Sequence, residues 1–365
     1  MRRIRGLHLE ARGARRAPQV TQKQEVSMCR PASVSLAVLI GGFLFTFGAA
    51  ATVAGQSAGG SSRPWTPQRL ADGQPNIMGM WNNEESNHTP LEMPAELAGR
   101  SSFTKDELQA RAEARAKQRI EAGDSAGKGD VGFYALYWFD WYWRKPLAGD
   151  WPALVVEPKT GKMPALTPKA RQTAAYMRER LHDTYANMEA GDRCISRGVL
   201  GLMMPTAYNN GILILQSPGH VVIHNEMIHT ARIIPLDGRP HLDAKIRRWE
   251  GDPRGRWEGN TLVIESTNFR AVDNMRAPNG RAPQTEQRRV VERFTIVDAD
   301  MLKYSVTVDD PETYTAPWTI SFPYRRDNKY RQYEYACHEG NYAVPNSLSG
   351  ARAEERAGAA RPSSR

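Results

Sequence analysis

The second half of the chain consists of short apolar runs separated by turn residues. Many runs are rich in Val, Ile, Tyr and Thr, and residues 302–308 alternate between apolar and polar positions, as a half-buried strand requires. The pattern predicts strands at residues 211–217, 221–224, 228–234, 261–265, 290–297, 302–308, 318–324 and 330–337. Since no helix-length periodic segment separates them, we expect residues 191–345 to form an antiparallel meander that closes, or nearly closes, into a barrel.

Residues 76–190 show another pattern, in which helical and aromatic segments follow one short strand at residues 77–81. Thr104 and Glu107 have the spacing of a capping box, which predicts a charged, alanine-rich surface helix that runs to about residue 122. Thr167 followed by a proline predicts a second helix that runs to about residue 187. We expect this region to lie over the barrel as a lid.

The remaining segments are expected to lack regular structure. Residues 55–75 are rich in Gly, Ser and Pro and predict a linker, and residues 84–100 predict a loop. Residues 346–365 are rich in Ala, Arg, Glu and Ser, which is typical of a disordered tail. A chain of 365 residues with 40% hydrophobic and 24% charged side chains is still too apolar to be wholly disordered, and it has no collagen or coiled-coil pattern.

The first 54 residues have the pattern of an export signal. A basic stretch precedes the apolar run from Ser35 to Phe47, and small residues follow it as far as Ala54. We expect cleavage between Ala54 and Ala58, with Met28 as an alternative start. The apolar run is short for a membrane-spanning helix of about 20 residues, although a retained anchor is the alternative. We therefore predict a periplasmic or secreted protein that meets the membrane only through the uncleaved signal segment.

The net charge of +9 at first suggests a nucleic-acid partner, but its location argues against one. Residues 1–54 carry eight basic and two acidic side chains, so +6 of the +9 lies in the signal segment and +3 remains for the rest. A nearly balanced domain has no strong electrostatic attraction for phosphates.

Export also determines how the cysteines are interpreted. Only Cys194 and Cys337 follow the signal segment, and an even pair in an oxidising compartment predicts a disulfide. Such a bond would close a loop of about 140 residues, which corresponds to about 4–5 kcal/mol in the chain-entropy model. The alternative is two separate buried thiols.

The segment from His224 to His241 is the first candidate for chemistry. It holds three of the eight histidines, with two carboxylates and two arginines between them. Glu226 or His229 could transfer a proton while Arg232 or Arg239 holds an anion. We predict Glu226, His229 and Arg232 as a catalytic group. On a strand, His224 and Glu226 would share a face while His229 faces the other way, whereas a turn at residues 225–227 would place Glu226 at the barrel mouth. The alternative is a hairpin whose residues face solvent. Three converging ligands are not visible, so we predict no metal.

Aromatic and arginine-rich segments are the other candidates. Eight of the eleven residues at 133–143 are aromatic, and they could either wall a ligand pocket or plug one end of the barrel, of which we favour the plug. The Trp- and Arg-rich stretch 247–261 could close a barrel end by stacking. The predicted ligand-binding residues are Trp81, Tyr137, Trp138, Trp141, Arg239, His241, Trp249 and Arg256. Lipase, Walker and dinucleotide motifs are absent from the sequence, and we predict no cofactor.

Several blocks together resemble a large family of exported bacterial proteins without an established activity. The blocks lie at residues 154–168, 193–194, 237–241, 255–263, 309–318 and 334–342, and the resemblance extends over residues 75–355. The chain departs from the family pattern at residues 150–153 and at Asn260. Gly79-x-Trp81 is similar to the motif of the first lipocalin strand. The resemblance implies a mainly β fold, namely an antiparallel lipocalin-like (calycin-type) barrel with an N-terminal helical and aromatic extension.

These observations lead to three functional hypotheses. A barrel of about eight strands has room for one small ligand, so we expect the protein to bind a small apolar or aromatic molecule in the barrel. The second hypothesis is a cofactor-independent periplasmic lyase, isomerase or hydrolase that uses Glu226, His229 and an arginine. The third is a structural envelope protein.

Overall fold

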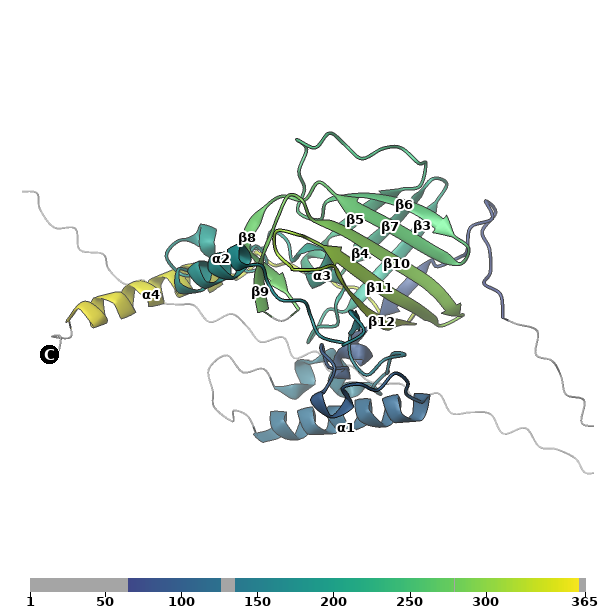
Figure 1. Ribbon diagram of the computed structural model, residues 1–365, viewed down its shortest axis with the longest axis horizontal. Helices are drawn as coiled ribbons and strands as arrows, with labels where there is room; N and C mark the ends of the chain where they lie inside the picture. Colours follow the sequence, from purple (N-terminus) through teal and green to yellow (C-terminus); the bar gives the residue numbers. More distant parts are fainter. Residues whose placement is uncertain (1–64, 126–134, 279, 361–365) are drawn as a thin grey trace, which may run out of the picture. The chain divides into compact units, whose positions relative to one another are not determined.

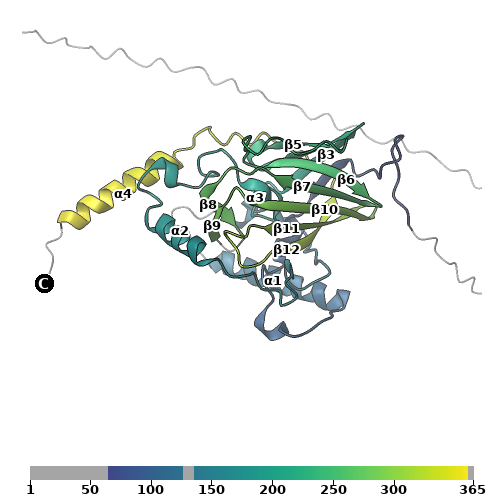
Figure 2. The same ribbon diagram turned by 45° about the horizontal axis from the view of Figure 1, so that its top comes forward.

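The computed structural model describes residues 65–125, 135–278 and 280–360 (Figures 1 and 2). The predicted signal segment and most of the predicted linker lie outside these residues, as do Phe133 and Tyr134 of the aromatic run. The expected mainly β architecture is confirmed. No helix in the described part of the chain is long and apolar enough to cross a membrane.

Nine antiparallel strands form a nearly closed barrel. They are β1 (Gly79–Asn82), β3 (Gly211–Ser217), β4 (His220–Asn225), β5 (Ala231–Pro235), β6 (Asp252–Glu258), β7 (Thr261–Thr267), β10 (Arg289–Asp298), β11 (Met301–Asp309) and β12 (Trp318–Arg326). Their order is β5-β4-β3-β1-β12-β11-β10-β7-β6. The two end strands β5 and β6 also pack against each other. Gly255 permits this approach, because a Cβ there would lie 2.7 Å from Ile234 and 2.6 Å from Leu236.

Several strand predictions agree with the structure and one is wrong. Residues 330–337 form no strand, because the side chains of Tyr330 and Gln332 fasten this segment across the ends of β3 and β4. β6 was not expected, because the proline and glycine in its sequence favour a turn. In the structure its pairing with β7 makes it a strand. Three further strands were also not expected. They are β8 (Val272–Ala277) and β9 (Gly280–Gln284), which form a hairpin, and β2 (Val155–Glu157), which pairs with β12.

The helices lie outside the sheet (Figures 1 and 2). The capping box is confirmed at α1 (Lys105–Ser125), where the Thr104 amide donates to Glu107 over 3.0 Å and the Glu107 amide donates to Thr104 Oγ1 over 3.1 Å. α2 (Pro168–Glu179) begins at the expected Thr167 cap but ends sooner than expected, and η5 (Tyr185–Asn187) follows. The expected disorder after residue 346 is wrong for the described part of the tail, where α4 (Ala343–Ala360) forms and Arg352 donates to the Asp183 carbonyl.

One end of the barrel is covered by α3 (Gly198–Met203), all of whose residues are buried. Asn83 Nδ2 and the Tyr324 hydroxyl both donate to the Met203 carbonyl over 2.7 Å, and Asn225 Nδ2 donates to the Leu202 carbonyl over 3.0 Å. These bonds satisfy the last carbonyls of the short helix, which its own backbone leaves unpaired. The plug that we expected from the aromatic run is therefore supplied by α3.

Large side chains fill the barrel interior. Tyr304 lies at the centre of an aromatic group, with its ring centroid 4.8 Å from that of Phe294, 5.2 Å from Phe322 and 5.9 Å from Tyr324. All four rings are at most 2% exposed. Such packing leaves the interior of the barrel without the room that a ligand would need.

A buried ion pair crosses the same interior. Arg232 on β5 donates through both terminal nitrogens to Glu292 on β10, over 2.6 and 2.9 Å, and Tyr304 donates to the same carboxylate over 2.9 Å. β5 and β10 are not neighbours in the sheet, so the pair ties opposite walls together. Burial by itself would lower the pKa of Arg232, but the adjacent Glu292 raises it above its ordinary value, so the guanidinium stays charged.

The predicted disulfide between Cys194 and Cys337 is confirmed. It joins the loop before α3 to the segment that follows Tyr330, and Asn341 Nδ2 donates to Cys194 Sγ over 3.1 Å. The bond therefore holds the C-terminal segment against the covered end of the barrel.

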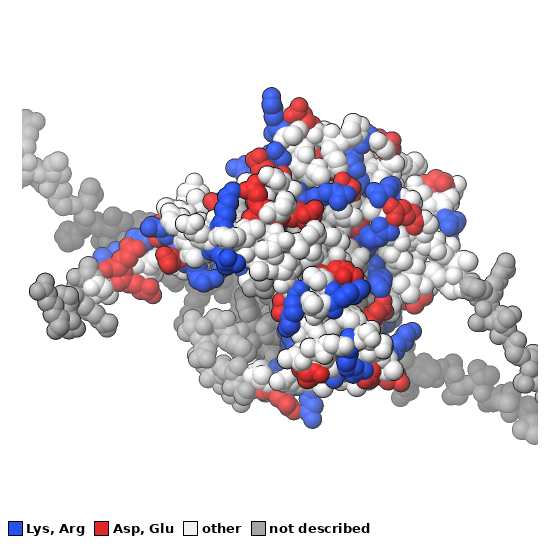
Figure 3. All heavy atoms as spheres, in the orientation of Figure 1, with Lys and Arg blue, Asp and Glu red and all other residues white. Residues whose placement is uncertain are grey.

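Basic and acidic side chains alternate over the face shown in Figure 3. Many charged side chains in the described part of the chain form pairs, such as Arg289 with Glu265 at 2.8 Å and Arg293 with Glu258 at 2.7 Å. That face therefore offers no extended surface of one charge sign.

Glu292→Gln should lower the free energy of unfolding by about 3–5 kcal/mol, because it leaves the Arg232 charge buried and uncompensated. Glu258→Gln, which breaks exposed ion pairs with Arg256 and Arg293, should cost about 1 kcal/mol or less. Urea unfolding of both variants measures the difference. Replacing Arg232 and Glu292 together by Met and Leu should recover most of the lost stability. Equal losses in Glu292→Gln and Glu258→Gln would contradict the conclusion that the buried ion pair matters more than the exposed one.

Cys194→Ser should lower the free energy of unfolding by about 2–4 kcal/mol, because the disulfide restricts the unfolded chain. Cys337→Ser should cost as much, and the double variant should cost little more than either single variant, since one substitution already removes the bond. Denaturant midpoints compare the three proteins. Additive losses from the two single variants would show that the cysteines act separately.

Candidate functional site

The structure does not bring Glu226, His229 and Arg232 together as one group. The Arg232 guanidinium is bonded to Glu292 inside the barrel. His229 is exposed on η6 (Met227–His229), and its ring meets that of His224 edge to face with centroids 4.6 Å apart. Glu226 is only 1% exposed and has a different set of partners. The predicted catalytic group is thus divided between three environments.

Glu226 is positioned by the turn that ends β4. Its amide donates to the Gly211 carbonyl over 3.0 Å, and its carbonyl accepts from the His229 amide over 2.9 Å. Ile228 and His229 adopt left-handed backbone angles, φ 60° and 56°, which reverse the chain before β5. Gly211 is required beside this turn, because a Cβ there would lie 2.5 Å from the Tyr330 ring.

The Glu226 carboxylate accepts hydrogen bonds from three groups. Asn209 Nδ2 donates over 3.2 Å, the Tyr333 amide donates over 3.4 Å, and the Tyr330 hydroxyl donates to the other oxygen. Burial raises the pKa of Tyr330, and the Glu226 carboxylate raises it further, so the hydroxyl keeps its proton.

A second carboxyl, Asp140, approaches this site from the aromatic run. It begins η4 (Asp140–Trp143), and its amide donates to the Ala207 carbonyl over 3.1 Å. Asn210 Nδ2 donates to its carboxylate over 3.3 Å. Burial raises the pKa of Asp140, and the charge of Glu226 adds to this effect, although the Asn210 hydrogen bond opposes it.

The third carboxyl, Glu84, was not singled out by the sequence. It begins η1 (Glu84–His88), directly after β1, and is 1% exposed. Burial raises its pKa to about 7 even though Arg144 opposes the shift, and Asp140 adds to it. Arg144 is shared, since it contacts Glu84 and also lies 2.7 Å from Asp327. We call Glu84, Asp140 and Glu226 the carboxyl cluster.

The carboxyl cluster has groups suited to proton transfer, because a carboxyl that titrates near pH 7 can both take up and release a proton. No set of three or more His, Cys, Asp or Glu residues in the described part of the chain is arranged to hold a metal ion. The three carboxyls line none of the cavities described below.

Trp81 and the described part of the aromatic run do not line the barrel cavity that we expected, nor any cavity described below. Trp81 is fully buried in the core, with its Nε1 bonded to the Ile77 carbonyl and the Arg326 guanidinium 4.1 Å above its ring. Tyr137 and Trp138 are 61% and 63% exposed. Trp141 is 4% exposed, and its ring meets the His88 ring edge to face at 5.4 Å.

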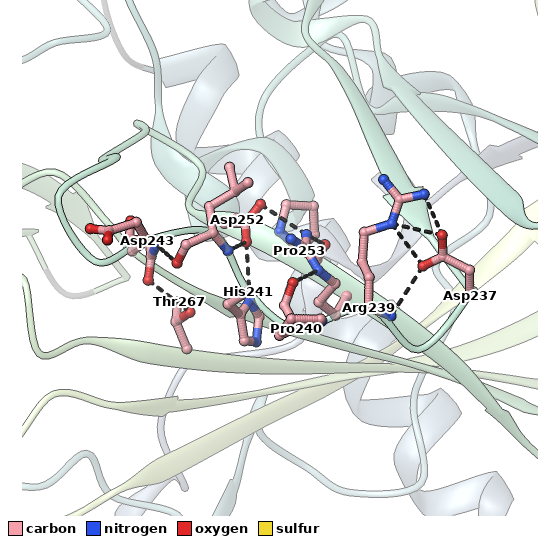
Figure 4. A network of polar contacts seen from close by, with 11 residues as sticks. Asp237, Arg239, Pro240, His241, Asp243, Asp252, Pro253 and Thr267 are labelled. Atoms are coloured by element: carbon pink, nitrogen blue, oxygen red, sulfur yellow. Dashed lines mark hydrogen bonds and ion pairs between the residues drawn. The ribbon is translucent and has the colours of Figure 1, made fainter.

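Four other predicted ligand-binding residues lie in or beside the loop between β5 and β6 and have local partners. Figure 4 shows Arg239 paired with Asp237 and the His241 ring beside Asp252, 3.2 Å from its carboxylate. Arg256 pairs with Glu258 at 2.7 Å, and the Arg270 guanidinium lies 5.3 Å from the Trp249 ring.

Asp252 organises that loop. Its carboxylate accepts from the Leu242 amide over 2.9 Å and from Arg254 over 2.9 Å. Burial would raise the pKa of Asp252, but the Leu242 amide and Arg254 together hold it below its ordinary value. Arg239, His241, Trp249 and Arg256 have local structural partners and line none of the cavities described for residues 65–125, 135–278 and 280–360.

A cavity of about 250 Å³ lies between α1 and the segments around residues 88–96 and 148–152. We call it the α1 cavity. Apolar side chains supply most of its wall, among them Pro90, Pro94, Leu108, Ala112, Trp151 and Pro152. Its polar lining comes from His88, Glu96, Arg111, Arg115 and Gln118.

His88 is the buried polar group of the α1 cavity. It is 1% exposed, and neither ring nitrogen has a partner with good hydrogen-bond geometry in the described part of the chain. Burial lowers its pKa to about 4, and the positive charge of Arg119 contributes, while the nearby Trp141 backbone partly opposes the shift. The ring is therefore neutral near pH 7.

The block Asn82–His88 is the main feature that the sequence analysis missed, because we expected residues 84–100 to be a plain loop. The available signal was the density of amides, carboxylates and a histidine directly after a strand.

No family model, curated protein or solved structure matches the chain. The function must therefore be argued from these contacts.

Glu84→Gln should flatten the dependence of stability on pH. The folded protein holds the pKa of Glu84 near 7, above its ordinary value of 4.5, so wild-type stability should fall as pH rises from about 4.5 through 7. Linkage sets this loss at about 3 kcal/mol, and the variant should lack it. Urea unfolding at pH 5 and pH 8 measures the difference, and parallel profiles of the two proteins would contradict the assignment.

Proposed function

We propose that the protein is exported and binds a small, largely apolar molecule in the α1 cavity. The single observation that carries the proposal is a cavity of about 250 Å³ with apolar walls and the fully buried, neutral His88 in its lining. Ligand sites in proteins commonly combine apolar walls with a few fixed polar groups. An apolar cavity of about 150 Å³ can hold benzene, so the α1 cavity has room for a substituted single ring.

The α1 cavity replaces the barrel interior as the proposed ligand site, because side chains fill the barrel. Two larger clefts are less suitable. The one beside β11 and β12, about 420 Å³, has no buried polar or charged side chain in its lining. In the cleft beside α3 and β9, about 490 Å³, the buried Glu189 is already paired with Arg281 at 3.3 Å.

Export is supported by the sequence of the first 54 residues and by the disulfide, which suits an oxidising compartment. A lipocalin-like relationship is part of the same proposal. It is supported by Gly79-x-Trp81 on β1, where Gly79 has φ +123° and a Cβ would lie 2.8 Å from Arg326. The glycine thereby lets Arg326 lie over the Trp81 ring.

Ala112→Phe should abolish binding, because the new ring would occupy the cavity. Wild-type protein without residues 1–54 is screened by thermal shift against single-ring aromatics, terpenoids and sugars. A ligand at 100 times its Kd should stabilise the folded state by about 2.7 kcal/mol. Ala110→Phe, on the exposed side of the same helix, is the control and should retain the response.

Circular dichroism establishes that both variants are folded. In addition, Leu108→Ala should enlarge the cavity and favour bulkier ligands. The proposal fails if no compound raises the Tm of the wild-type protein, or if Ala112→Phe responds as strongly as Ala110→Phe.

Acid–base catalysis at the carboxyl cluster is a second candidate. The observation that favours it is the pKa of Glu84 near 7 beside two further carboxyls. Compounds that raise the Tm are incubated with the protein and followed by mass spectrometry. Turnover that Glu84→Gln abolishes, without loss of the thermal shift, would support this candidate. Unchanged compounds, or turnover that survives the substitution, would exclude it.

A further inference from the structure

Helix α1 presents a row of arginines beside the row of side chains that it buries. Leu108, Ala112 and Ala116 are 5%, 4% and 8% exposed and recur at intervals of four, so they form one stripe. Arg111, Arg115 and Arg119 have the same spacing, and Arg111 and Arg115 each lie one position before a member of that stripe. The arginine row therefore runs along the edge of the buried face, where Arg111 and Arg115 line the α1 cavity.

Two of the three arginines have partners. Arg111 lies 3.6 Å from Glu96, which is the carboxylate in the cavity lining. Arg119 donates to the Asn87 carbonyl over 2.7 Å, and its guanidinium lies 4.5 Å from the Trp141 ring.

Arg115 differs from its neighbours. Within the described part of the chain it has no ion pair or hydrogen bond, although it lines the α1 cavity. Arg115 is exposed to solvent overall, but the protein on one side of its guanidinium displaces water and lowers its pKa. The same effect lowers the pKa of the half-buried Arg119, which the charge of Arg115 lowers further. Both arginines also lower the pKa of His88. The positive charge of Arg115 in the cavity lining is thus balanced by no carboxylate, because Glu96 already forms an ion pair with Arg111.

We propose that the ligand of the α1 cavity is an apolar carboxylate, with its acid group held by Arg115 next to His88 and its apolar part against Leu108, Ala112 and Trp151. This inference rests on the proposed function and specifies its ligand class. The planar guanidinium can donate two parallel hydrogen bonds to a carboxylate. The apolar wall would bury the remainder of the molecule.

The bound acid should also act on His88. An adjacent negative charge favours the protonated imidazole, so binding should move the pKa of His88 upward from about 4. The charged and titratable groups that face His88 are Arg115 and Arg119 from α1, which oppose protonation. NMR titration of the His88 ring with and without ligand would detect the shift.

Benzoate and benzamide test the acid group directly, because they differ in charge while sharing one ring. Isothermal titration at pH 7 and low salt compares their Kd values for protein without residues 1–54. We expect benzoate to bind about 10- to 100-fold more tightly, as for a hydrogen bond to a charged group. Arg115→Gln should remove this preference, and Arg115→Lys should restore part of it.

Lys117→Gln is the matched control, because it removes one positive charge from the same helix at a side chain that is 79% exposed. It should leave the preference unchanged. Equal binding of the two compounds, a preference that survives Arg115→Gln, or an equal loss in Lys117→Gln would overturn the inference while leaving apolar binding intact. Failure of both compounds to bind, with no other single-ring compound binding, would instead reject the proposed function.

Discussion

Arg232 and Glu292 meet inside the barrel, where no solvent can replace the hydrogen bonds that they exchange. A charge in such a place is stable only beside its partner. The ion pair therefore fixes the spacing between the two strands that carry it, β5 and β10. Tyr304 completes the group by donating to the same carboxylate. The aromatic side chains then pack around this fixed core and fill the barrel interior.

Because side chains fill the barrel, the candidate sites lie at its ends and on its outside. One short segment, η1, contributes residues to two of them. η1 contributes Glu84 to the carboxyl cluster at the barrel end, and it contributes His88 to the α1 cavity. The segment is almost wholly buried although nearly every side chain in it is polar. Burial removes these polar groups from water, which raises the pKa of Glu84 and lowers that of His88.

The site could be predicted from the sequence only in part. Glu226 was identified because a carboxylate near two histidines suggests acid–base chemistry, and it does lie buried at the end of β4. Its partners Tyr330 and Asn209 come from distant parts of the chain, 104 and 17 residues away. Arg232 was assigned to the same group because it is near in sequence, but alternation along β5 turns it into the barrel and away from that site.

The sequence by itself determined the antiparallel β architecture, most strand positions, the capping box of α1 and the disulfide partners, since these depend on local alternation, turn residues and cysteine number. Only the tertiary structure decided which polar side chains become buried together. It also decided that α3 covers the barrel end, because that depends on bonds to residues about 120 positions away, and that β6 is a strand, because β6 forms only by pairing with β7. The periodicity of the sequence indicates which face of a helix or strand is apolar. Which element packs against that face depends on the whole fold.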